Sequence, residues 1–143
     1  MCGIFAIYNK FDDKNTIQNV INGLKRLQHR GKDGSGISYI TTTTNNFKVI
    51  KALGRVRDSF KDDCNQDTTR ICIGHVRYST SGKTVAKEYL SEKEKKDELQ
   101  PFIGKTKDNE CVSIIHNGNI PNIQSQDTQY LFNILLTSEI GIE

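Results

Sequence analysis

The second residue of the chain is a cysteine with the chemistry of an N-terminal nucleophile. If Met1 is removed, Cys2 carries a thiol and a free α-amine on the same α-carbon. A thiol titrates near ~8.5 and an α-amine near ~7.7–8.0, so at neutral pH some of the amine is available to take the thiol proton. The alternative is a structural cysteine beside a buried strand, because cysteine is among the residues most often buried.

The composition describes a polar globular chain. Its 143 residues are 35% hydrophobic and 26% charged, and no apolar run is long enough to span a membrane. No basic segment followed by a long apolar stretch opens the sequence, so we expect a cytoplasmic protein. The formal net charge is +3 and lysines are dispersed among acids, a pattern that does not favour nucleic acid as a partner.

The cysteines and histidines do not follow a metal-binding pattern. The four cysteines include no C-x-x-C pair, and the three histidines are far apart in the sequence. We therefore expect no metal and no other cofactor. In a reducing compartment we expect reduced thiols, with Cys72 and Cys111 in apolar runs that suit a small hydrophobic residue.

Hydrophobic periodicity predicts an α+β domain. The expected strands are residues 3–8, 37–42, 47–53, 71–78 and 111–115, of which the second and third form a hairpin. The expected helices are residues 16–27, with Asn15 or Thr16 as cap, and residues 127–138. The first strand is expected to be covered on both faces. Residues 83–98, rich in Lys and Glu, are expected to form a solvated loop or a frayed surface helix without chemistry.

Polar stretches follow or precede these elements at four places. They are the N-terminus and residues 28–36, 74–82 and 116–122, and the second of them contains three glycines within six residues. Strand ends hold side chains in fixed positions, so we expect the four stretches to converge on one pocket.

Five short motifs resemble the N-terminal-nucleophile class II glutamine amidotransferases, most closely the glutaminase domain of amidophosphoribosyltransferase. They are CGIF (2–5), LQHRGKD (27–33), GHVRYST (74–80), QPF (100–102) and HNGN (116–119). The resemblance implies an αββα sandwich of two antiparallel sheets with flanking helices. Because the family's domain continues beyond the point matching Glu143, we expect an incomplete sandwich: one shortened glutaminase domain at residues 1–143, without a phosphoribosyltransferase (synthase) domain.

The same resemblance assigns catalytic roles. Cys2 would attack the side-chain amide of glutamine, with its own α-amine as base and then as acid toward ammonia. Asn117 through its side-chain amide and Gly118 through its backbone N–H would form the oxyanion hole. The alternative for this pair is an ordinary Asn-Gly turn.

Substrate binding is assigned in the same way. Arg77 would hold the α-carboxylate of glutamine, a task suited to a planar bidentate donor, and Asp127 would hold the α-ammonium. The alternatives are a surface ion pair for Arg77 and a helix N-cap for Asp127, and the Asp127 role is compatible with a cap. The segment before Asp127 is shorter than in the family.

Four further residues have supporting roles by resemblance. Tyr78 and Thr80 would line the glutamine pocket, and Arg30 and Asp33 would brace it without reacting.

Three hypotheses for function follow. The first is a glutaminase that releases ammonia through a thioester on Cys2, for use by a separate ammonia-acceptor protein. The second is a shortened homologue that binds glutamine or a protein partner without turnover, and the third is a structural assembly module. Unpaired sheet edges and an uncovered apolar face would favour a homo-oligomer.

Overall fold

The computed structural model describes residues 1–41, 43, 46–60, 67–78, 90–121 and 127–137. The elements in chain order are β1 (Gly3–Asp13), α1 (Thr16–Arg26), the 3₁₀ turn η1 (Gln28–Arg30), β2 (Gly34–Ile40), β3 (Phe47–Leu53), α2 (Val56–Ser59), β4 (Thr69–Arg77), α4 (Glu92–Asp97), β5 (Phe102–Lys105), β6 (Cys111–Ile114) and α5 (Asp127–Thr137).

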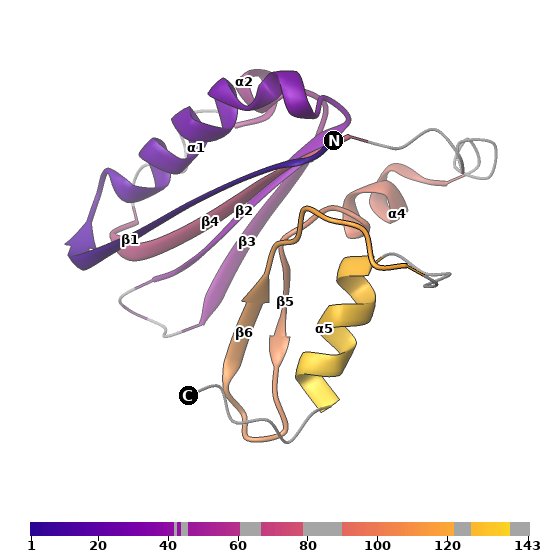
Figure 1. The fold of residues 1–143 in the computed structure, drawn as a ribbon. Coiled ribbons are helices and arrows are strands. Elements are labelled where there is room, and N and C mark those ends of the chain that lie inside the picture. The colour runs from indigo at the N-terminus through magenta and orange to yellow at the C-terminus, as the bar shows by residue number, and fades with distance from the viewer. Residues whose placement is uncertain (42, 44–45, 61–66, 79–89, 122–126, 138–143) are drawn as a thin grey trace.

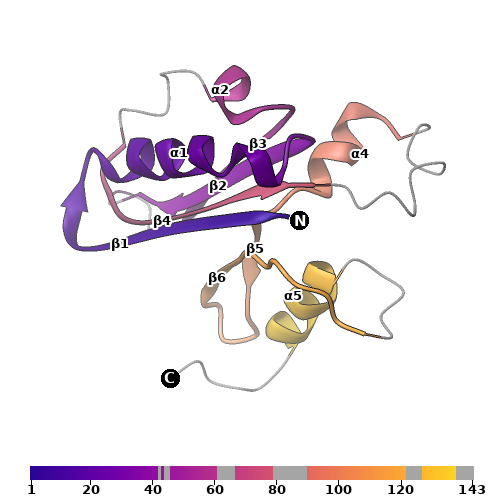
Figure 2. The same ribbon diagram turned by 45° about the horizontal axis from the view of Figure 1, so that its top comes forward.

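Two antiparallel sheets and their helices form four layers. The larger sheet has the strand order β1-β4-β2-β3, and the smaller one consists of β5 and β6. Helices α1 and α2 lie on one side of the larger sheet, whereas β5, β6 and α5 lie on the other (Figures 1 and 2). The predicted αββα arrangement of two antiparallel sheets with flanking helices is confirmed.

The main core lies between α1 and the larger sheet. The apolar positions that predicted this helix are those it buries: Ile17, Val20 and Leu24 are fully buried, and Ile21 nearly so. They pack on inward-facing residues of β2 and β4, among them Ile37, Cys72 and Val76. Asn15 is the N-cap residue, but its side chain makes no capping hydrogen bond.

The second face of the larger sheet meets the smaller sheet. Side chains alternate along a strand, so Ser38 points away from the α1 face that Ile37 and Tyr39 fill. The Ser38 and Ser113 hydroxyls lie 2.6 Å apart, which joins β2 to β6. Helix α5 covers the outer face of the small sheet, where the rings of Phe102 and Phe132 stack with centroids 5.9 Å apart.

The expectation that the first strand is covered on both faces is wrong. β1 is an edge strand that pairs only with β4, and it continues to Asp13. Ile4 is 46% exposed and Tyr8 is 71% exposed, because β5 and β6 lie beside β3 and leave this part of the second face open. The apolar run at residues 4–8 is therefore only half covered here.

Where the structure describes residues 83–98, it shows the surface helix that was one of the two expectations, but its start is well defined and not frayed. Residues 92–97 form α4, which begins with a capping box: the Ser91 side chain accepts from the Glu94 N–H, and the Glu94 carboxylate accepts from the Ser91 N–H. Because this reciprocal cap satisfies backbone donors, the charged helix starts at a defined residue. Within the described residues, no helix is long and apolar enough to cross a membrane.

Candidate active site

Cys2 lies immediately before β1, at one end of the larger sheet. The segment that follows α1 contacts it there. The backbone carbonyl of Cys2 accepts a hydrogen bond from Nε of Arg30 at 3.0 Å. Its thiol lies 3.9 Å from the carbonyl oxygen of Tyr78, just past the end of β4. Three segments that are far apart in the sequence, the start of β1, η1 and the end of β4, therefore meet at Cys2.

The glycine-rich turn packs against the end of β4. The N–H of Asp33 donates to the carbonyl of Arg77 at 3.1 Å, and the Asp33 carbonyl accepts from Gly54 N–H at 3.1 Å. A Cβ at Gly31 would lie 2.5 Å from the carbonyl carbon of Arg77, so only glycine fits this approach. The turn that the sequence singled out thus holds the backbone of the residue expected to bind substrate carboxylate.

The guanidinium group of Arg77 is bound by Glu98, the residue that follows α4. Nη2 of Arg77 donates to the Glu98 carboxylate at 2.9 Å, and Nη1 donates to the Glu98 backbone carbonyl at 2.8 Å. The Arg77 side chain is only 14% exposed and that of Glu98 is 34% exposed, so the cation of this ion pair is largely buried, in contrast to the surface ion pair considered from the sequence.

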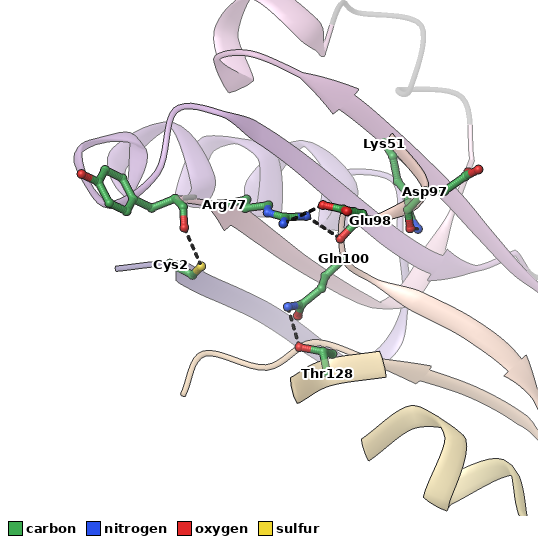
Figure 3. A network of polar contacts seen from close by, with 8 residues as sticks. Cys2, Lys51, Arg77, Asp97, Glu98, Gln100 and Thr128 are labelled. Atoms are coloured by element: carbon green, nitrogen blue, oxygen red, sulfur yellow. Dashed lines mark hydrogen bonds and ion pairs between the residues drawn. The ribbon is translucent and has the colours of Figure 1, made fainter. Parts of the chain in front are cut away.

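Gln100 connects three elements beneath the larger sheet. Its side-chain oxygen accepts from the backbone N–H of His116 at 2.6 Å, and its side-chain NH₂ donates to the hydroxyl of Thr128 at 2.7 Å (Figure 3). Gln100 and Thr128 are both buried. His116, which precedes Asn117, is therefore held by the buried side-chain amide of Gln100. Gln100 in turn lies two residues after Glu98, the partner of Arg77.

Asp127 is the first residue of α5, and its carboxylate accepts the backbone N–H of Ile120 at 2.8 Å. This bond ties the turn after β6 to α5, a role that the sequence did not predict. Asn117 and Gly118 lie exposed between the two anchored residues, His116 and Ile120.

The structure thus brings the sequence-predicted residues into two groups. Direct contacts join Cys2, Arg30, Asp33, Arg77 and Tyr78. Asn117, Gly118 and Asp127 belong to a second group that is held together through Gln100 and Ile120. Glu98 and Gln100, two residues apart, link the groups. Thr80 lies outside the described residues.

Comparison with known proteins extends this description. No family model matches the chain. The solved glutamine phosphoribosylpyrophosphate (PRPP) amidotransferase of B. subtilis, complexed with ADP and GMP, superposes with a TM-score of 0.68 at 22% identity, over 99% of this chain and 30% of that one. At that identity the likeness shows the fold alone, and the fold is the one described above.

Two curated relatives carry the comparison further. An amidophosphoribosyltransferase of Methanocaldococcus jannaschii is 37% identical over 123 residues, which are 85% of this chain and 23% of the relative. An amidophosphoribosyltransferase of Staphylococcus aureus (strain COL) is 35% identical over 126 residues, 87% of this chain and 22% of the relative. Over most of its length the chain is therefore homologous to amidophosphoribosyltransferases, which are class II glutamine amidotransferases. It spans about a quarter of the length of these relatives.

Three residues of this amidotransferase chain have structural roles that the sequence did not predict. The sequence places Glu98 in a charged stretch for which no chemistry is expected, gives Gln100 only as part of the QPF motif, and gives no sign of a role for Thr128. Only the positions of Glu98 and Gln100 could have indicated these roles: Glu98 ends the charged run, and Gln100 begins the QPF motif after Leu99.

His75 is a buried histidine of the amidotransferase sheet. It is 1% exposed, and neither ring nitrogen has a hydrogen-bond partner among the described residues. Its neighbour Val76 fills the α1 core, so by alternation His75 lies on the face toward the smaller sheet. Burial, with smaller contributions from the charges of Arg77 and His116, lowers the pKa of His75 to about 4.

This pKa predicts an acid-sensitive fold. Below pH 6.5 the unfolded chain binds a proton at His75 that the folded chain does not accept until about pH 4, so stability is lost as pH falls through that interval. Between pH 7 and pH 5 we expect this residue to lower the free energy of unfolding by about 2 kcal/mol. Urea unfolding of wild type and His75→Leu at both pH values measures the effect, and an unchanged pH dependence in the variant would contradict it.

Proposed function

We propose that this chain catalyses the glutaminase half-reaction, the hydrolysis of the glutamine side-chain amide to glutamate and ammonia. The observation that carries the proposal is the placement of Cys2. Arg30 binds its backbone carbonyl, the Tyr78 carbonyl lies against its thiol, and Tyr78 adjoins the Arg77 guanidinium. A nucleophile and a carboxylate-binding cation therefore lie at the same end of one sheet.

The reaction would proceed through a thioester on Cys2. Removal of Met1, which is 77% exposed, would free the α-amine. That amine takes the thiol proton while Sγ bonds to the side-chain carbonyl carbon of glutamine. The C–N bond then breaks and ammonia leaves with the proton returned by the amine. Water hydrolyses the thioester, which gives glutamate and restores the thiol.

Asn117 and Gly118 would stabilise the oxyanion of the tetrahedral intermediate. The turn that holds them is anchored on both sides, at His116 by Gln100 and at Ile120 by Asp127, which supports a fixed donor geometry.

Binding of free glutamine would use its two charges. Arg77 would bind the α-carboxylate and Asp127 the α-ammonium, with Tyr78 and Thr80 lining the pocket. Arg30 and Asp33 would brace the site, in keeping with their contacts to Cys2 and to Arg77.

Ammonia would pass from this site to an acceptor. The relatives are named amidophosphoribosyltransferases, and by analogy the acceptor here would be a phosphoribosyl compound bound by a separate protein or domain. A chain that binds glutamine without turnover is the competing function, and the experiment below separates the two.

The test is intact mass spectrometry before and after treatment with a diazoketone analogue of glutamine. We expect a chain that lacks Met1 and gains one equivalent of label, which peptide mapping places on Cys2. Ammonia release should likewise require an N-terminal Cys2, and should be lost in Cys2→Ala and in protein that retains Met1.

Cys111→Ala is the matched control, because Cys111 is also partly exposed but lies at the start of β6, with its Sγ 3.6 Å from the side-chain oxygen of Asn46. This variant should be labelled and active like wild type. Glutamine binding without label or ammonia would instead select the binding module.

A further inference from the structure

The cation expected to bind the substrate carboxylate already carries a carboxylate of its own chain. Arg77 donates from Nη2 to Oε2 of Glu98 at 2.9 Å and from Nη1 to the Glu98 carbonyl at 2.8 Å. The ion pair is asymmetric in exposure, because Arg77 is 14% exposed and Glu98 is 34% exposed. The Arg77 guanidinium group is thus largely buried, whereas the Glu98 carboxylate is partly accessible to solvent.

We propose that the Glu98 side chain occupies on Arg77 the place that the α-carboxylate of glutamine takes, and that Glu98 thereby sets the affinity of the site for substrate. This inference rests on the proposed function. Glu98 would act as an internal competitor, because binding of glutamine requires its carboxylate to leave Nη2 or to share it with a second negative charge.

Arg77 does not depend on the Glu98 carboxylate alone for its position. The backbone carbonyl of Glu98 binds Nη1, and that carbonyl is fixed by the end of α4. The N–H of Glu98 bonds to the Glu94 carbonyl at 3.2 Å, and the next residue, Leu99, is buried against Gly34. Removing the negative charge therefore leaves Arg77 anchored through the backbone.

The exchange is chemically balanced. A charge-assisted hydrogen bond to Glu98 is replaced by an equivalent bond to the substrate carboxylate. The released Glu98 side chain, already one third exposed, is hydrated instead. Binding of glutamine is then weaker by the free energy of the Arg77–Glu98 contact, and loss of the Glu98 charge should strengthen it.

The test compares Glu98→Gln with wild type on two substrates. The amide oxygen that this substitution introduces at position 98 can still accept a hydrogen bond from Nη2 of Arg77, but it carries no charge. We expect the KM for glutamine to fall about tenfold with kcat unchanged. The KM for glutamine α-amide, which lacks the carboxylate, should not change, whereas a general structural effect would alter both substrates alike.

Glu92→Gln is the matched control, because Glu92 is an exposed carboxylate in the first turn of the same helix. It should leave both KM values as in wild type. If Glu98→Gln does not fold, Glu98→Asp, which keeps the charge but withdraws it by one methylene group, should give a smaller fall in KM for glutamine alone.

Two outcomes overturn the inference, and labelling of Cys2 shows whether the proposed function fails with it. A KM for glutamine that is unchanged or raised in Glu98→Gln would show that the carboxylate only positions Arg77. Labelling of Cys2 by the glutamine analogue would persist in that case. Absence of glutamine binding, turnover and Cys2 labelling in wild type would instead overturn the proposed function and this inference with it.

Discussion

Replacing Asn117 with alanine is expected to lower kcat for glutamine hydrolysis by about 10²–10³-fold, because one oxyanion donor is worth ~2.7–4 kcal/mol of the barrier. The effect requires that the amide be held where the charge develops. The structure supports this requirement, since the backbone N–H of His116 is bound by the buried Gln100 side chain at 2.6 Å. Steady-state ammonia release at saturating glutamine measures the change.

Asn119→Ala provides the control, because Asn119 is an exposed residue of the same type in the same turn. We expect its kcat to stay within about twofold of wild type, as for a surface substitution worth less than ~0.5 kcal/mol. Asn117→Ala should also bind glutamine with little change in affinity, since the donor acts mainly in the transition state. Equal losses in both variants would indicate a general disturbance of the turn and would contradict the oxyanion role.

The parts of the fold that the sequence predicted are those in which local pattern and burial coincide. The positions Ile17, Val20, Ile21 and Leu24 recur at helical spacing, and all four are buried beneath α1. The β2–β3 hairpin was likewise predicted from two β-branched runs, and its strands pair in register from Gly34 with Leu53 to Ile40 with Phe47.

β1 shows where pattern alone is insufficient. An almost wholly apolar run is typical of a strand covered on both faces, yet its cover depends on where other strands lie. Here β5 and β6 pack beside β3, at the far edge of the sheet from β1. The position of the second sheet depends on contacts between segments far apart in the sequence, so no local feature of residues 3–8 indicates it.

The candidate site divides in the same way. Cys2 and Arg77 are candidates because they lie in short motifs, and Asp127 because of its position in the family resemblance, but none of these signals identifies their partners. Glu98 is one of several acids in a charged run, and only the point at which α4 ends decides which carboxylate meets Arg77, 21 residues away in the sequence. The sequence therefore names candidate reactive groups but not the contacts that position them.

Gly36→Ala should be the most damaging single substitution at the junction of the two sheets. A Cβ at Gly36 would clash with the backbone carbonyl oxygen of Gln100. That backbone cannot move freely, because the Gln100 side chain binds both His116 and Thr128. We expect a loss of about 2–4 kcal/mol in the free energy of unfolding by urea, from overpacking against a fixed backbone.

The same substitution should slow labelling of Cys2 by the glutamine analogue, because displacement of Gln100 moves both the His116 turn and Glu98, which lies two residues before Gln100 and binds Arg77. Ser35→Ala is the control at the preceding residue, on the α1 face: it also gives alanine but removes a hydroxyl and adds no bulk. Ser35 is fully buried, and its hydroxyl has no hydrogen-bond partner in the part of the chain that is described, so its loss should change stability by less than about 1 kcal/mol. Wild-type stability in Gly36→Ala, or an equal loss in Ser35→Ala, would show that the close approach of the two sheets at Gln100 does not hold the site together.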